Sequence, residues 1–183
     1  MGASMKVFRV VVVCSLALVA VGCGTRTPAA ATRILAADSA ALARTAVCFV
    51  PPDPSLGLSE RAQQGRIVEI CEAAARDQGI DVVAMGRGQC LAASMGWTVR
   101  DTGDRASQCS GTVGGAECYS TAVRVKSLKL ALAQPGKVLA ETTASIRSDR
   151  AEFTRESFHA LCAAAFHDFP QPLSNVQFEV PVD

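Results

Sequence analysis

The sequence has few aromatic and imidazole side chains: it holds one Trp, one Tyr and two His among 183 residues. It also lacks a charge excess, because 18 Lys and Arg residues face 17 Asp and Glu residues, for a formal net charge of +1. A near-neutral chain has little long-range attraction for a phosphate backbone. The composition therefore argues against nucleic acid as a partner.

Motifs of common catalytic and cofactor sites are missing from the sequence. It contains no CxxC pair, no Cys/His set at zinc spacing and no GxSxG nucleophile elbow. The glycine clusters at 86–88 and 111–115 lack the strand-to-helix spacing of phosphate-binding loops. Asp101 and Asp104 lack the alternating oxygen ligands of a calcium loop. We therefore expect no enzyme, no cofactor and no metal ion.

The longest apolar run is too short for a membrane span. Lys6 and Arg9 precede the apolar residues 10–21, and a transmembrane helix needs about 20 such residues. A positive start followed by a short apolar core is typical of an export signal. We predict a signal peptide over residues 1–22.

The residues that end this segment, Val19-Ala20-Val21-Gly22-Cys23, resemble the lipobox of bacterial lipoproteins, with Ala20 where Leu is usual. The resemblance implies cleavage before Cys23, attachment of fatty acids such as palmitate to that cysteine, and a membrane-anchored mature chain. Gly24 stands where an Asp implies retention in the inner membrane. The resemblance thus implies the outer membrane, with the periplasmic face of the inner membrane as the alternative.

The residues after the lipobox predict a tether and then one domain. Residues 23–44 are rich in Ala and Thr and lack a sustained apolar stripe, which favours a lipidated N-terminus followed by a flexible linker with a short helix over 34–42. The remaining length, 45–183, suits a single periplasm-facing domain.

The cysteine count agrees with a lipid on Cys23. Of eight cysteines, Cys14 lies in the predicted leader. Acylation of Cys23 leaves an even set for disulfides in an oxidising compartment, namely Cys48, Cys71, Cys90, Cys109, Cys118 and Cys162. Cys71 and Cys162 fall on the apolar stripes of two expected helices, so we expect them to pair. Cys48 with Cys90 and Cys109 with Cys118 complete one of about 15 possible connectivities.

The hydrophobic pattern of the domain predicts strands and two helices. Strands are expected at 46–50, 80–85, 93–99, 119–133, 138–146 and 176–182. Helices are expected over 60–78, capped by Ser59 and ended by Gly79, and over 149–169, started by a capping box at Asp149 and Glu152. A surface loop is expected over 101–117, a bulge near Lys126 and Ser127 where the apolar phase changes, and a type II turn over 134–137.

This order of elements predicts an α/β (α+β) fold. We expect a two-layer, disulfide-stapled sandwich, with a mixed sheet of five or six strands and two helices on one face. The order is similar to that of small α/β modules in envelope lipoproteins.

Two groups of residues suggest chemistry beyond folding. His159 lies three residues before Cys162, the spacing of a Cys/His nucleophilic pair on one helix face. A disulfide cysteine beside a rim histidine fits the same spacing, and we favour it; His167 has no third metal ligand near it in the sequence. The second group, Arg124, Lys126, Lys129 and Arg147, is a candidate basic patch on the hairpin that could contact lipid headgroups or an acidic partner. Solvated sheet faces and edges commonly carry such charges, and we favour that interpretation.

Three functions remain open at this level. The first is a non-catalytic accessory or assembly component of a cell-envelope complex, which binds a protein partner and no small-molecule cofactor. The second is an immunity or ligand-binding lipoprotein. The third is an envelope hydrolase centred on His159.

Overall fold

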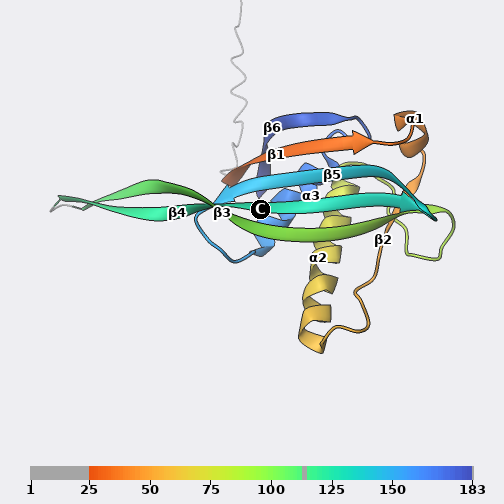
Figure 1. The fold of residues 1–183 in the computed structure, drawn as a ribbon, viewed down its shortest axis with the longest axis horizontal. Helices are drawn as coiled ribbons and strands as arrows, with labels where there is room; N and C mark the ends of the chain where they lie inside the picture. Colours follow the sequence, from red (N-terminus) through yellow and green to blue (C-terminus); the bar gives the residue numbers. More distant parts are fainter. Residues whose placement is uncertain (1–24, 113–114, 183) are drawn as a thin grey trace, which may run out of the picture.

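The computed structural model describes residues 25–112 and 115–182, which form one six-stranded mixed sheet with helices on one face (Figure 1). The strand order is β2-β3-β4-β5-β1-β6. The strands are β1 (Thr25–Leu35), β2 (Ala46–Phe49), β3 (Cys90–Thr112), β4 (Gly115–Gln134), β5 (Lys137–Ser148) and β6 (Leu173–Val182). The helices are α1 (Ser39–Leu42), α2 (Leu58–Asp77) and α3 (Arg155–Phe166). The expected two-layer α/β fold is confirmed.

The core lies between the sheet and the two longer helices. Leu128, Leu130 and Leu132 alternate along β4 and are buried, because successive side chains of a strand point to opposite faces. They meet an apolar face of α3 that includes Phe158 and Leu161. We call the other side of the sheet, which carries the intervening residues, the open face.

The expected bulge near Lys126 is wrong. β4 pairs with β3 in unbroken register from Arg124 to Ala133. Lys126 therefore occupies the same face as Leu128 and is buried with it. The apparent phase change arose because a charged residue holds a core position.

The expected tether is also wrong for the described residues 25–44. β1 is an interior strand, paired antiparallel with β5 on one side and with β6 on the other. Its small residues, Ala29 and Ala31, are buried beneath α3. A segment rich in Ala and Thr shows little alternation between apolar and polar residues, so the sequence alone predicts a linker there. The folded domain thus begins by Thr25 instead of residue 45.

The expected loop over 101–117 is instead the far part of a long hairpin. β3 and β4 pair from Ala92–Ala133 to Thr112–Gly115, whereas β4 pairs with β5 only from Arg124 onward. The hairpin beyond residues 101 and 124, which we call the arm, therefore extends past the rest of the sheet (Figure 1). Three residues, 102–104, face one residue of β4 where the arm begins. This bulge carries Gly103 at a φ of 78° and hides the strand period in the sequence.

The expected strand over 80–85 is wrong, because this segment contributes only one isolated parallel bridge, between Val47 and Val82, to the described structure. The helix starts also shift. Gly57 caps α2 in place of Ser59, and Thr154 caps α3 in place of Asp149, with its side chain accepting from the Ser157 amide. The first and third expected strands, the α2 helix and its terminal Gly79, the turn at Pro135-Gly136 and the edge strand β6 are confirmed.

Two of the expected disulfides are present. Cys48 of β2 is bonded to Cys90 of β3, and Cys71 of α2 to Cys162 of α3. The third expected pair, Cys109 and Cys118, lies directly opposite in the backbone register. Cys118 is disulfide-bonded. The side chain of Cys109 lies outside the described part, so Cys109 as its partner stays a prediction.

Candidate functional site

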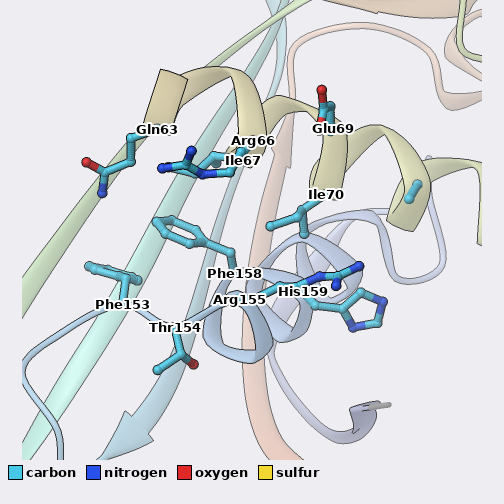
Figure 2. Close-up of a pocket in the computed structure, with 11 residues that line it drawn as sticks. Gln63, Arg66, Ile67, Glu69, Ile70, Phe153, Thr154, Arg155, Phe158 and His159 are labelled. Carbon is cyan, nitrogen blue, oxygen red and sulfur yellow. The ribbon is translucent and has the colours of Figure 1, made fainter. Parts of the chain in front are cut away.

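A groove of about 570 Å³ runs between α2 and α3 on the outer side of the helical layer (Figure 2). Ile67 and Ile70 reach toward it from α2, and Phe158 reaches toward them from α3. Phe153, just before α3, stacks on Phe158 with ring centroids 4.7 Å apart. These side chains form an apolar floor.

The Cys71–Cys162 disulfide holds the two helices that form this groove. Both cysteines are fully buried, and their Cα atoms are 5.0 Å apart. Trp97 of β3 packs edge-on against Phe158, with centroids 5.6 Å apart. The disulfide and the Trp97 contact therefore hold the groove floor against the core and the sheet.

The rim of the groove is polar and carries more positive than negative charge. Arg66 of α2 and Arg155 of α3 are exposed there, together with Gln63. Glu69 also lines the groove, but its carboxylate points away from the His159 ring (Figure 2). The groove can accept an apolar group and an anion beside it.

His159 does not form a nucleophilic pair with Cys162, because the Cys162 sulfur is bonded to Cys71. Thr154 lines the same groove, and its hydroxyl oxygen caps α3 by accepting a hydrogen bond from the Ser157 amide nitrogen, 3.2 Å away. The His159 Nδ1 atom is buried and has no hydrogen-bond partner among the described residues. The geometry therefore fits a rim histidine beside a disulfide cysteine, which is the interpretation that we favoured from the sequence.

The two histidines line one small cavity of about 190 Å³ at the far end of the helix pair. The His167 ring stacks on Phe178 of β6 at 4.0 Å, and its Nε2 atom lies 3.4 Å from an Asp168 carboxylate oxygen. Asp77 and Glu179 also line the cavity. Within residues 25–112 and 115–182, no group of three His, Cys, Asp or Glu side chains is placed to hold a metal ion.

Two buried cations from the sheet hold the ends of α3. Arg33 of β1 donates to the carbonyls of Ala165 and His167 at the end of the helix, at 2.7 and 2.9 Å. Lys126 of β4 donates to the Glu152 carbonyl and to the Ser157 hydroxyl near its start. Arg33 meets the unpaired carbonyls at the C-terminal end of α3, where a cation is favoured. Lys126 lies near the N-terminal end, where the helix dipole does not favour a cation, and is held there by its two hydrogen bonds. The sequence showed no sign that Arg33 is structural.

Burial shapes the ionisation of both cations. Loss of water lowers the pKa of Arg33 to about 10, although the negative charge of Asp168 opposes the shift. Desolvation also lowers the pKa of Lys126, against the raising effect of Glu152 and Asp149. Both side chains therefore lose part of the stabilisation that water gives a charge.

The candidate basic patch on the hairpin is not a single surface. Arg124 and Lys126 point to the helical side, where Arg124 donates to the Asp149 carbonyl at 3.1 Å and Lys126 is buried. Lys129 and Arg147 point to the open face. The period of two along a strand divides residues that are close in sequence between the two faces.

The open face has its own row of cations. The register places Arg100 of β3 and Arg147 of β5 on either side of Val125 of β4. Both arginines are exposed, and neither forms an ion pair with another described residue. A shallow hollow of about 620 Å³ adjoins the row. It is lined by small residues of β1 and β5, such as Ala30 and Ser145, and by Gln177 and Glu179 of β6.

No helix in the described part of the chain is long and apolar enough to cross a membrane.

No protein-family model and no curated protein matches the chain. A PDZ domain protein from Parabacteroides distasonis is similar in structure, with a TM-score of 0.49 and 9% identity. The match covers 85% of this chain but only 39% of that one. A PelC dodecamer from Paraburkholderia phytofirmans has a TM-score of 0.42 and 16% identity over 75% of this chain and 93% of that one. Likenesses at this level carry no functional assignment.

Proposed function

We propose that this chain is a membrane-anchored lipoprotein that acts as a non-catalytic accessory or assembly component of a cell-envelope complex. The observation that carries the proposal is the arm of β3 and β4. Its two strands pair with each other and with no other strand of the described residues.

An isolated two-stranded ribbon is marginally stable in water. β2 pairs with β3 only over residues 90–93, so the backbone edge of β3 is open from there through the arm, within the described chain. An open edge accepts a strand from another protein through main-chain hydrogen bonds. The arm is therefore suited to docking a protein partner.

A lipid on Cys23 would place the docking site, and so the partner, at the membrane surface. β1 begins at Thr25, two residues after the proposed attachment site, and two residues span at most about 7 Å. The domain would thus stand directly on its membrane, which we propose to be the outer membrane.

Removal of the arm tests the docking role. Residues 106–121 are replaced in the full chain by Asn-Gly, so that Arg105 and Ala122, which are paired, are joined by a two-residue turn. We expect unchanged membrane attachment and both disulfides intact, but loss of the partner that cross-links to the wild type in intact cells. Equal recovery of the same partner with the shortened chain would contradict the proposal.

The anchor is tested separately with Cys23→Ala. The wild-type protein should carry acyl chains on residue 23 by mass spectrometry and stay with the membrane fraction. The variant should lack them and be released. An unmodified cysteine in the wild type would overturn the lipoprotein assignment.

A ligand-binding lipoprotein is the second candidate, and the groove between α2 and α3 favours it. Its volume lies within the range of about 300–1,000 Å³ typical of ligand sites, and its apolar floor and arginine rim suit an amphiphile with an acidic group. Trp97, the single tryptophan, contacts Phe158 and so reports on occupancy. Titration with laurate should shift its fluorescence in the wild type and less in Arg66→Gln/Arg155→Gln; no shift in either protein would remove this candidate.

A further inference from the structure

We infer that the open face beside the start of β1, with its row of Arg100, Val125 and Arg147, lies against the bilayer and binds the phosphates of anionic phospholipid headgroups. The inference rests on the proposed function, because it takes Cys23 as the lipid site.

The register brings this row to the end of the sheet where β1 begins. Ala29 pairs with Ile146, the residue before Arg147. Pro28 and Arg147 line the same hollow. An acyl chain on Cys23 would therefore enter the bilayer beside the row.

The charges of the open face favour an anionic surface. Among the described residues, four exposed cations lie there: Arg26, Arg100, Lys129 and Arg147. Arg26 pairs with Glu179 at 3.6 Å, and Lys129 pairs with Glu141 at 3.0 Å. The two arginines of the row remain unpaired with carboxylates of the described chain and give the face its excess positive charge.

The geometry of the row fits headgroup phosphates. Neighbouring strands lie about 4.8 Å apart, so the Cα atoms of Arg100 and Arg147 are separated by roughly 10 Å. Each guanidinium can reach its own phosphate, to which it donates two parallel hydrogen bonds. Val125 and the small residues Ala30 and Ser145 are shorter than an arginine side chain, and the Glu179 carboxylate of the hollow is paired with Arg26. A basic surface beside an acyl chain strengthens attachment to an anionic membrane.

Arginine footprinting tests the contact on the anchored wild-type protein. The protein is reconstituted into vesicles of phosphatidylcholine alone or mixed with phosphatidylglycerol, and treated with phenylglyoxal before peptide mass analysis. Arg100 and Arg147 should be several-fold less modified in the phosphatidylglycerol vesicles. Arg44 and Arg87, which are exposed near the opposite end of the sheet, should react equally in both. Equal modification of all four would overturn the inference.

A second measurement uses protein without the acyl chain on residue 23. Cys23→Ala protein is floated with the same vesicles, alone and with Arg100→Gln/Arg147→Gln or the matched pair Arg44→Gln/Arg87→Gln. Each arginine near an anionic surface contributes about fivefold in affinity. The first pair should weaken binding to phosphatidylglycerol roughly 25-fold, the matched pair should not, and 0.5 M salt should abolish the difference.

Failure of the proposed function and failure of this inference give different results. An unacylated wild-type Cys23 defeats the proposed function, whichever vesicles bind. An acylated protein whose row is neither protected nor needed for vesicle binding defeats only this inference, and points instead to an acidic protein surface. An equal loss of vesicle affinity in the two double variants also overturns the inference, because binding would then depend on net charge alone.

Discussion

The guanidinium of Arg33 donates to the main-chain carbonyl of Ala165 at 2.7 Å, which joins the interior strand β1 to the last turn of α3. The same side chain donates to the carbonyls of His167 and Gln171 and to the Thr142 hydroxyl. One buried cation thereby satisfies helix carbonyls that have no partner within the helix. The first strand is for this reason an integral part of the fold.

We predict that Arg33→Met lowers the free energy of unfolding by about 3–5 kcal/mol, because several carbonyls lose their donor. Thr142→Val removes only the 3.0 Å bond to Arg33 and should cost about 1 kcal/mol. Urea unfolding with the disulfides intact measures both. Equal losses in the two variants would show that the helix carbonyls find water instead.

Lys126 should give the stability a distinct pH dependence. Its pKa is lowered by burial from 10.5 in the unfolded chain, so between the two values the unfolded state binds more protons. The free energy of unfolding then rises with pH across that window. The difference between the wild type and Lys126→Met should therefore move in favour of the wild type as the pH rises toward 10.5. Lys129→Met, on the exposed open face, is the control and should keep the wild-type slope; parallel curves for wild type and Lys126→Met would contradict the prediction.

The Cys71–Cys162 bridge should stabilise the fold substantially. It closes a loop of 91 residues, and loops of that size contribute on the order of 4–5 kcal/mol through the unfolded chain. Cys71→Ala/Cys162→Ala should lose about that amount in denaturant unfolding. Cys48→Ala/Cys90→Ala, with a separation of 42 residues, should lose slightly less, about 4 kcal/mol. A loss below about 1 kcal/mol for the first pair would contradict this account.

The bulge at the base of the arm should depend on Gly103. Its φ of 78° lies in the left-handed region, so Gly103→Ala should cost about 1 kcal/mol and speed amide exchange over residues 105–107. Gly96→Ala, in β3 without a positive φ and with nothing within 4 Å of the new Cβ, should be neutral or slightly stabilising. Slower exchange in Gly103→Ala than in the wild type would contradict the role given to the bulge.

Much of the fold could be predicted where the sequence period is plain. The apolar stripe of α2 and the turn at Pro135-Gly136 need only local rules, and both are confirmed. The candidate site was harder to predict. The spacing of His159 and Cys162 identified one helix face, but the groove depends on α2, which lies far away in the sequence.

The sequence by itself determined the alternating elements of an α/β sandwich and the six cysteines that follow residue 23, and it predicted an export signal, because each follows from local chemistry or from counting. Only the tertiary structure decided that residues 25–35 are a strand, that Lys126 is buried in register, and that Arg100 and Arg147 share one row. Pairing between strands distant in sequence sets those outcomes. A strand of small residues such as β1 carries too little apolar contrast to be recognised without its neighbours.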